Sequence, residues 1–216
     1  MKFITLTNIL ILQSNAIAQL QGQGQASYDT NPTEEYGKCS YPAHTYKKFT
    51  SIGVPNFENS QSCGMCLQVI NTDTQKSTIV HVVDQCQSCG ENDLNLNLEA
   101  FNEIGDTSKG RINIQWHTVP CDDTQGNIQY YWQANSNEWN GAFQIRNTKL
   151  PVSSVQVQTK PNQWENLTLR SDNYWTIKNL SNNNISIKLT CEGGETIEDT
   201  FPILSQGGIV NSQKQF

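Results

Sequence analysis

Two closely spaced pairs of cysteines are the residues of this chain with the clearest chemistry. Cys63 and Cys66 stand three positions apart in "CGMC", and Cys86 and Cys89 repeat that spacing in "CQSC". Four thiolates in a C-x2-C-x19-C-x2-C pattern fall within the spacing of a zinc ribbon. The same thiols can instead be oxidised in pairs, which would give disulfides and no metal site.

The N-terminal segment and the number of cysteines favour disulfides. Lys2 precedes the apolar stretch "FITLTNILIL", and "NAIA" has small residues at the cleavage positions, which is typical of a secretory signal over residues 1–18. A chain on that route folds in an oxidising compartment, where cysteines pair. Six cysteines precede residue 122, more than the four that a zinc ribbon needs. We therefore predict no metal or other cofactor and three disulfides of open connectivity, formed by Cys39, Cys63, Cys66, Cys86, Cys89 and Cys121.

The charge and hydropathy of the chain exclude several classes of partner. The net charge is −6, from 14 Lys and Arg against 20 Asp and Glu, and no basic cluster exceeds Lys47–Lys48. Nucleic-acid binders carry a basic patch, so no nucleic acid is expected. No apolar run beyond the leader approaches the length of a membrane span, and the C-terminus lacks the hydrophobic tail of a lipid-anchor signal. We expect a secreted, extracellular monomer with no membrane contact in its mature form.

The elements that position the cysteines are predicted from hydrophobic periodicity. Residues 77–84 form a β-branched run of strand length, and residues 111–119 alternate apolar and polar side chains. Between these strands one helix is expected at residues 98–104, after the capping residue Asn97. The polar, Gln- and Gly-rich start of the mature chain, residues 19–35, reads as a linker.

Beyond the turn-rich stretch 121–127 the sequence contains only strand patterns. β-prone runs such as "GAFQIRN" and "NISIKLTC" alternate with Asn, Gly, Pro and Ser at intervals typical of an antiparallel sandwich. Cys191 lies on one of these runs and is expected to be a buried small hydrophobic residue. Three N-x-S/T sequons in this half predict surface glycosylation of an exported chain, at Asn166, Asn179 and Asn184.

Six sequence segments, in order, resemble one known family. They read "YGKCSY", "CGMC", "VVDQC", "NDLNLNLEAF", "GRINIQWHTVPC" and "GAFQIRN". With this cysteine framework they resemble the expansins and expansin-like proteins over nearly all of residues 36–206. The resemblance implies an all-β fold of two domains. The first, residues 36–122, would be a six-stranded double-psi β-barrel related to family-45 endoglucanases, and the second, residues 127–216, an immunoglobulin-like β-sandwich that binds cellulose.

The resemblance also implies a polysaccharide-binding groove on the barrel, where two aspartates matter in the family. The first falls at Asp84, and the second falls at Asn95, in "LNLN" where the family has "LDLS". Asp93 lies two residues before Asn95, so on an extended segment both side chains point the same way, although turns also favour Asp for structural reasons. We take Asp84, Asp93 and Asn95 as candidate polysaccharide-binding residues.

On the sandwich, the microbial members of the family use two adjacent Trp residues and a Tyr, whose flat rings stack on sugar rings. The alignment places these three positions at Trp139, Asn140 and Asp172, with Tyr174 close to the last. One platform residue of three is kept, so we predict weak binding of a cell-wall or matrix polysaccharide, cellulose being the first expectation. Three other tryptophans, Trp132, Trp164 and Trp175, are expected in the sandwich core.

These residues favour a protein that binds cell-wall polysaccharide and loosens its noncovalent contacts without hydrolysis. Inverting glycosidases need an acid and a base carboxylate, and Asn95 can neither donate nor accept a proton in that role. No catalytic residue is therefore assigned, and an enzyme is not expected. Two alternatives stay open: a structural extracellular-matrix or cyst-wall protein that binds polysaccharide without loosening it, and a weak family-45-type glycoside hydrolase.

Overall fold

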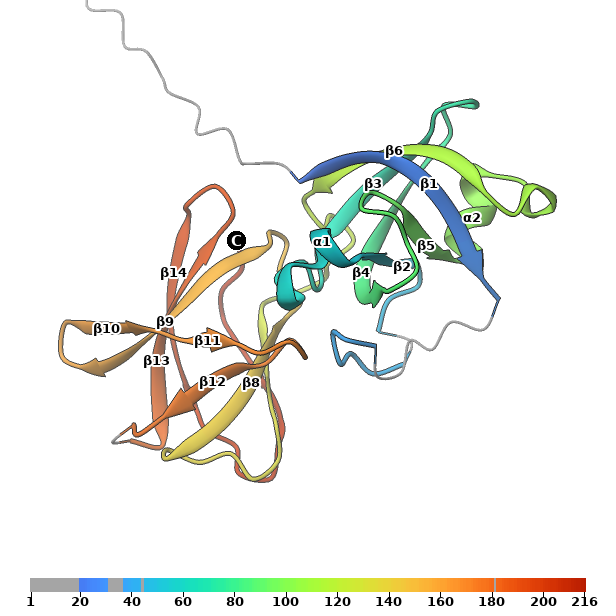
Figure 1. The fold of residues 1–216 in the computed structure, drawn as a ribbon. Helices are drawn as coiled ribbons and strands as arrows, with labels where there is room; N and C mark the ends of the chain where they lie inside the picture. The colour runs from blue at the N-terminus through green and yellow to red at the C-terminus, as the bar shows by residue number, and fades with distance from the viewer. Residues whose placement is uncertain (1–19, 31–36, 44, 181) are drawn as a thin grey trace, which may run out of the picture.

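Two β-structured parts lie side by side in the computed structural model, which describes residues 20–30, 37–43, 45–180 and 182–216 (Figure 1). The first part is a closed barrel with the strand order β1-β5-β2-β4-β3-β6. Its β1–β5 and β2–β4 pairs are parallel and the other pairs are antiparallel, as expected for a double-psi barrel. The barrel strands are β1 (Gln21–Asp29), β2 (Phe49–Gly53), β3 (Cys66–Asn71), β4 (Ser77–Cys86), β5 (Leu94–Asn97) and β6 (Ile112–Val119).

Strand β1 corrects one prediction, because the expected linker at residues 19–35 contains it. Gln and Gly have little intrinsic preference for strands, but β1 pairs on both of its edges, with β5 and with β6. A Cβ at Gly22 would lie 2.7 Å from the indole of Trp116, so glycine lets the strand close over that ring. Pairing and close packing therefore stabilise a strand that the propensities of its residues do not predict. The predicted signal segment, residues 1–18, lies outside the described residues.

The two strands and the helix predicted around the cysteines are confirmed as β4, β6 and α2 (Leu98–Ile104). Helix α2 begins after Asn97, whose side-chain oxygen accepts a hydrogen bond from the amide of Ala100 at 3.3 Å. Its buried face, which includes Phe101 and Ile104, packs on the barrel core. The other helical segments are short: α1 (Val54–Phe57), η1 (Glu58–Ser60) and η2 (Thr107–Lys109). Among the described helices, none has the length and apolar composition that a bilayer crossing requires.

The second part consists of two antiparallel sheets around one core, in agreement with the predicted β-sandwich. The sheets have the strand orders β10-β9-β13-β14 and β11-β12-β8-β7-β15. Aromatic rings fill the space between them, and Tyr130 and Phe201 stack with their centroids 3.8 Å apart. The strands are β7 (Gln129–Trp132), β8 (Asn140–Arg146), β9 (Val152–Lys160), β10 (Gln163–Asn166), β11 (Thr168–Leu169), β12 (Trp175–Lys178), β13 (Asn184–Cys191), β14 (Thr196–Pro202) and β15 (Gly208–Asn211).

The predicted core residues of the sandwich are confirmed with one exception. Trp132 and Trp175 are buried in the core, and Cys191 is buried and unpaired on β13. Trp164 is only partly buried, on β10, where the ammonium of Lys188 lies 4.5 Å from its ring centroid. A cation that covers the ring holds it at the sheet surface, so Trp164 is not a core residue.

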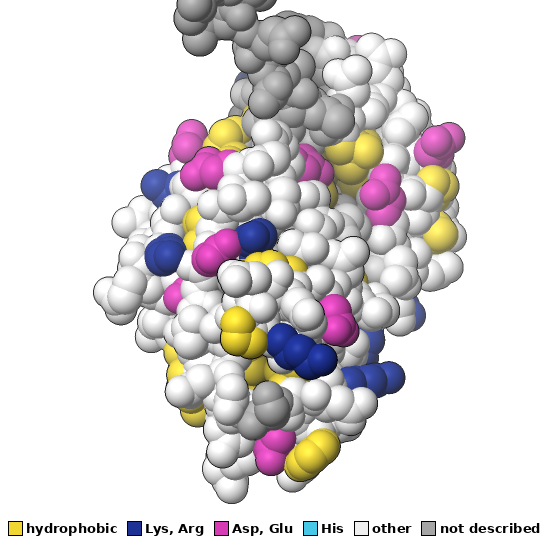
Figure 2. Space-filling model, turned by 90° about the vertical axis from the view of Figure 1, so that its left-hand side faces the viewer, with side chains coloured by type: hydrophobic (Ala, Val, Ile, Leu, Met, Phe, Trp, Pro, Cys, Tyr) yellow, Lys and Arg dark blue, Asp and Glu magenta, His cyan; other side chains and the backbone are white. Residues whose placement is uncertain are grey.

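The surface of the sandwich carries few charged side chains. On the face in Figure 2 the charged side chains of both signs are scattered among uncharged polar ones and form no continuous basic patch. The three sequon asparagines, Asn166, Asn179 and Asn184, are exposed. Their glycosylation stays a prediction.

Candidate functional site

A polar pocket of about 180 Å³ opens on the barrel wall where β1, β5, β2 and β4 run side by side. Ser51 on β2 is in register with Asn95 on β5 and with Asp84 on β4. Two of the three predicted barrel residues, Asp84 and Asn95, therefore line the same pocket. The lining residues are Asp29, Phe49, Ser51, Val83, Asp84, Gln85, Cys86, Asn95, Leu96 and Asn97.

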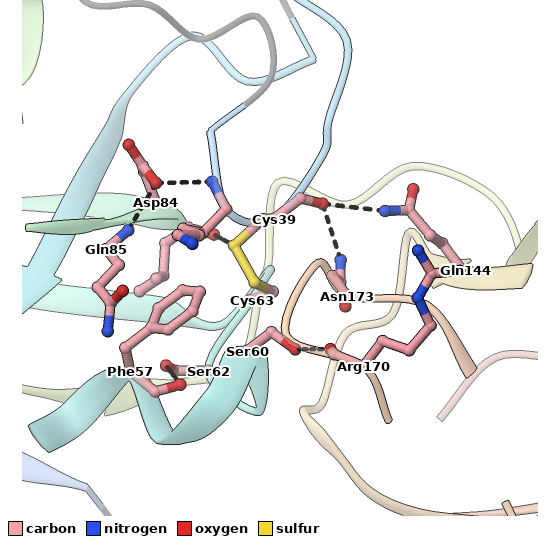
Figure 3. Close-up of a disulfide and its surroundings, with 12 residues drawn as sticks. Cys39, Phe57, Ser60, Ser62, Cys63, Asp84, Gln85, Gln144, Arg170 and Asn173 are labelled. Carbon is pink, nitrogen blue, oxygen red and sulfur yellow. Dashed lines mark hydrogen bonds between the residues drawn. A yellow bond between two sulfur atoms is a disulfide. The ribbon is translucent and has the colours of Figure 1, made fainter. Parts of the chain in front are cut away.

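The carboxylate of Asp84 is held in place by backbone amides. Its Oδ1 accepts hydrogen bonds from the amide of Lys38 at 2.6 Å and from that of Gln85 at 2.7 Å (Figure 3). The loop with Lys38 can come this close because Gly37 has no side chain. A Cβ at Gly37 would lie 2.9 Å from the carbonyl oxygen of Val83 and 3.0 Å from the Cβ of Asp84. Two amide donors to one oxygen fix the direction in which the carboxylate faces the pocket.

Asn95 is also oriented by its neighbours. Its side-chain oxygen accepts a hydrogen bond from the hydroxyl of Ser27 on β1 at 2.9 Å. Its backbone carbonyl accepts one from the hydroxyl of Thr50 on β2 at 3.1 Å. The side chain presents an amide, which donates and accepts hydrogen bonds but carries no charge and shuttles no proton.

Asp93 lies outside this pocket. Its Oδ1 accepts a hydrogen bond from the amide of Gln25 at 2.7 Å, and its Oδ2 accepts one from the amide of Gly90 at 3.1 Å. These bonds tie the turn before β5 to the neighbouring strand β1. Asp93 therefore has a structural role in this turn, which is the alternative that the sequence left open, and it does not line the pocket.

Asp29 is a pocket residue that the sequence analysis missed. It ends β1, two residues after Ser27, and its Cα is in register with that of Asn97 on β5. The sequence does not point to it, because the preceding residues have the composition of a linker. The alternation of Gln and Gly over residues 21–25, followed by "ASYD", is the signal from which a strand could have been inferred.

All six cysteines before residue 122 are paired, which confirms the prediction of three disulfides. The pairs are Cys39–Cys63, Cys66–Cys121 and Cys86–Cys89. The four cysteines of the ribbon-like pattern thus pair only partly with one another, since Cys63 and Cys66 take partners outside it.

Among the described residues, one group around His81 has the spacing of metal ligands. Cys66, His81 and Cys121 each place a sulfur or nitrogen atom within 4.8 Å of the others. The two sulfurs are bonded to each other, so neither is a thiolate that could bind a metal. His81 is 5% exposed, stacks on Tyr46 with a centroid distance of 3.9 Å, and has its Nε2 3.1 Å from the carboxylate of Asp123. It is a packed residue at the junction of the two parts.

The loop that contacts Asp84 also joins the barrel to the sandwich. The carbonyl oxygen of Cys39 accepts hydrogen bonds from the side-chain amides of Gln144 at 2.9 Å and Asn173 at 3.2 Å (Figure 3). From the other side of the Cys39–Cys63 disulfide, the hydroxyl of Ser60 donates to the carbonyl of Arg170 at 2.6 Å. The disulfide thus lies between the pocket and the second part.

Arg146 completes this interface. The side chain is 8% exposed, and its Nε donates to Oε1 of Gln144 at 2.7 Å. Its guanidinium lies 3.9 Å from the ring centroid of Tyr131 and 5.7 Å from that of Tyr41, a residue of the barrel. Burial lowers the pKa of Arg146 from its usual value, while the nearby tyrosines oppose that effect. A buried cation between aromatic rings of both parts makes them one packed unit.

On the sandwich, the structure presents the aromatic ring of Trp139 to solvent. Its side chain is 65% exposed, immediately before β8. Asn140 follows it on β8 and is also exposed. The backbone amides of both residues donate to the side-chain oxygen of Asn137, at 2.9 and 3.1 Å, so the loop that presents the indole is well defined.

The other two platform candidates do not form a flat aromatic surface. Asp172 is paired with the guanidinium of Arg170, which also donates to Gln133 at 3.2 Å. Tyr174 is only 8% exposed, and the Arg170 guanidinium lies 5.5 Å from its ring centroid. An ion pair thus occupies the place where a third ring is expected, and Tyr174 packs beneath it.

Several known proteins are related to this chain in sequence. Residues 29–121, which hold the pocket, match the Barwin family. Expansin-like protein 1 of Dictyostelium discoideum is 29% identical over 203 residues, 88% of this chain and 68% of that protein. Expansin-YoaJ of Bacillus subtilis is 32% identical over 131 residues, 61% of this chain and 56% of that protein. The chain is thus expansin-like in its sequence.

Solved structures agree with the fold of this expansin-like chain. The crystal structure of the apo expansin of Clavibacter michiganensis superposes with a TM-score of 0.79 over 91% of this chain and 98% of the other, at 24% identity. A mutant of the same Clavibacter expansin, crystallised in complex with cellohexaose, gives the same TM-score. The likeness shows a common two-part fold. The expansin-like chain spans only about half to two thirds of the lengths of the curated relatives named above.

Proposed function

We propose that this expansin-like chain is a secreted protein that binds cell-wall polysaccharide and loosens noncovalent contacts between its chains without hydrolysis. The barrel pocket carries the proposal, because it places a carboxylate, an amide and a hydroxyl, those of Asp84, Asn95 and Ser51, side by side. Sugar hydroxyls donate to carboxylates and both donate to and accept from amides, so this composition suits a glycan chain. The cellohexaose complex of a Clavibacter expansin with the same fold supports cellulose as the first ligand to test.

The chemistry of the pocket supports loosening rather than cleavage. Acid-catalysed cleavage of a glycosidic bond needs a group that protonates the leaving oxygen. Asn95, at the position where the family has an aspartate, cannot supply that proton, and two backbone amides hold the Asp84 carboxylate as a hydrogen-bond acceptor. Such a pocket can compete for the hydrogen bonds between neighbouring glycans while leaving their covalent bonds intact.

Changing Asn95 to aspartate should raise wall loosening several-fold. The change restores a carboxylate at a position where the family has one, and Ser27 already donates to the oxygen that it would replace. The measurement is creep of heat-inactivated cell walls under constant load, with reducing-sugar release assayed in parallel. Asn102→Asp, on the exposed face of α2, adds the same charge outside the pocket and should leave creep unchanged. Equal creep for wild type and Asn95→Asp would contradict the assignment of the pocket, and reducing sugar released by wild type would favour the hydrolase.

Removing the exposed indole should weaken binding to insoluble cellulose by at least about fivefold, because one ring stack contributes about 1 kcal/mol beyond its buried area. The variant is Trp139→Ala, and binding is measured by depletion from cellulose suspensions. Trp164→Ala is the matched control, since Trp164 lies on the other sheet and is covered by Lys188. If both variants lose affinity equally, the sandwich platform is misplaced.

The second candidate is a structural matrix protein that binds polysaccharide without loosening it. The ion pair of Arg170 and Asp172 favours it, because a platform with one ring grips a flat glycan surface weakly. Cellulose binding without creep, in wild type and in Asn95→Asp alike, would support this candidate over the first.

A further inference from the structure

The buried group of Cys66, His81 and Cys121 has a donor set that suits zinc once its disulfide is open. Nδ1 of His81 lies 3.4 Å from Sγ of Cys66 and 4.0 Å from Sγ of Cys121. In a tetrahedral zinc site, Zn–S bonds of about 2.3 Å and Zn–N bonds of about 2.0–2.1 Å put sulfur and nitrogen about 3.6 Å apart. The two distances lie on either side of that value, so the nitrogen is already near the separation from both sulfurs that the ion requires.

The other ring nitrogen of His81 is held by a carboxylate, as in many zinc sites. Nε2 lies 3.1 Å from Oδ2 of Asp123, and the ring stacks on Tyr46. Asp123 favours the tautomer with its proton on Nε2, which leaves the lone pair on Nδ1. Nδ1 is the nitrogen closer to Sγ of Cys66, at 3.4 Å against 3.6 Å for Nε2. Asp123 is therefore a positioning residue for the nitrogen that would bind the ion.

The burial of the three donors favours a doubly charged cation among them. Cys66, Cys121 and His81 are 0%, 2% and 5% exposed. Buried thiolates without a counter-charge are costly, whereas two thiolates and a neutral imidazole around Zn²⁺ form an uncharged unit. Thiolate and imidazole ligands suit zinc, while Mg²⁺ and Ca²⁺ prefer oxygen ligands.

The group lies where the barrel meets the sandwich. Cys66 is the first residue of β3, and Cys121 follows the end of β6. The backbone amide of Cys121 donates to the carbonyl of Lys149, between β8 and β9, at 2.8 Å. An ion bound to both sulfurs would join the same two segments that the disulfide joins.

We propose that Cys66, Cys121 and His81 bind one zinc ion when the disulfide between the two cysteines is reduced by a dithiol. The dithiol gives two electrons and two protons to the cysteine sulfurs, and its own sulfurs join in a disulfide. Zn²⁺ then replaces the two thiol protons, which pass to solvent, and two Zn–S bonds and one Zn–N bond form. A water molecule supplies the fourth ligand. While the protein disulfide is closed, the site cannot form.

The test uses Co²⁺ as the probe, because thiolate ligands give it a charge-transfer band and tetrahedral coordination gives it intense visible absorption. The full chain is reduced with excess dithiol, freed of reductant under anaerobic conditions, and titrated. Reduced wild type should develop both absorptions at one equivalent of Co²⁺, and Zn²⁺ should abolish them. The oxidised chain should show neither. Absorption in the oxidised chain, or none in the folded reduced chain, overturns the proposal.

Three single variants test the assigned roles. His81→Phe keeps a ring against Tyr46 but removes the nitrogen ligand, so it should weaken Co²⁺ binding by at least about tenfold. Asp123→Asn should weaken it by about tenfold while the charge-transfer band persists, since the carboxylate only orients the ring. His117→Phe is the matched control, because His117 lies on β6 outside this group, and it should bind as wild type does. Binding by His81→Phe that equals wild type overturns the proposal.

A double variant separates this site from the remaining thiols. Reduction of the whole chain also frees the other four paired cysteines, Cys39, Cys63, Cys86 and Cys89. Cys66→Ser/Cys121→Ser keeps these four and should bind Co²⁺ at least about tenfold more weakly than reduced wild type. Equal binding would assign the ion to the other thiols and overturn the proposal.

A variant that needs no reductant covers the case in which reduced wild type unfolds, as judged by circular dichroism. Cys121→Asp leaves the other two disulfides closed and offers the ion a thiolate, an imidazole and a carboxylate. It should bind one Co²⁺, and adding His81→Phe to it should weaken that binding by at least about tenfold. Absence of Co²⁺ binding in Cys121→Asp overturns the proposal.

Discussion

Replacing Cys66 and Cys121 together by alanine should lower the free energy of unfolding of the barrel by about 4 kcal/mol. The disulfide joins the first residue of β3 to the chain just after β6 and closes a loop of 55 residues. Without it, the unfolded chain gains the conformational freedom that closure of this long loop removes. The measurement is urea unfolding followed by hydrogen exchange of peptides from β3 and β6.

A matched control is present in the same barrel. Cys86→Ala/Cys89→Ala removes the same atoms and the same kind of bond, but its cysteines are only three residues apart. The loss should be about 1.5 kcal/mol, because closing so short a loop costs the unfolded chain little entropy. Equal losses in the two double variants would contradict the entropic account and would point to burial of the sulfurs instead.

Changing Arg146 to alanine should cost about 3 kcal/mol of stability and should release the barrel from the sandwich. The change removes the cation from between Tyr41 and Tyr131 and leaves the side-chain oxygen of buried Gln144 without its Arg146 donor. Because Gln144 also binds the carbonyl of Cys39, the interface should loosen as well. Thermal unfolding should split into two transitions, and the radius of gyration from small-angle scattering should increase.

Two variants serve as controls for Arg146. Arg170→Ala removes an arginine whose ion pair with Asp172 is partly exposed, at 40% for one side chain and 36% for the other, so the loss should stay below about 1 kcal/mol. Arg146→Lys keeps the charge but loses the planar group that stacks on Tyr131, so it should fall between wild type and alanine. A single transition and an unchanged radius in Arg146→Ala would show that other contacts hold the two parts together.

The parts of the barrel that the sequence predicted are those with strong local patterns. β4 and β6 are rich in β-branched or alternating residues, and α2 has a capping Asn97 and an apolar face, so propensity and tertiary structure agree. β1 has neither signal, because its Gln and Gly residues owe their extended form to pairing with two strands distant in sequence. Asp29 was lost from the predicted site together with this strand.

The same limit applies to the disulfides and to the sandwich platform. The number of bridges follows from the count of cysteines, but the pairing depends on which chain segments meet in the barrel. Trp139 could be aligned and is exposed, whereas the burial of Tyr174 depends on Arg170 and on the packing of the sheet. Local sequence indicates the residue types of the site, and long-range contacts decide which of them reach the ligand.

The Lys38–Cys39 segment gives the molecule a short mechanical path between its two parts. The amide of Lys38 holds the pocket carboxylate, and one residue later the carbonyl of Cys39 receives two side chains of the sandwich. The bond to Cys63 anchors this segment in the barrel covalently. Under the proposed function, with the sandwich bound to one polysaccharide chain and the pocket to another, tension between the two chains would pass through this cross-linked segment. Relative sliding of the chains would then displace the Asp84 carboxylate directly.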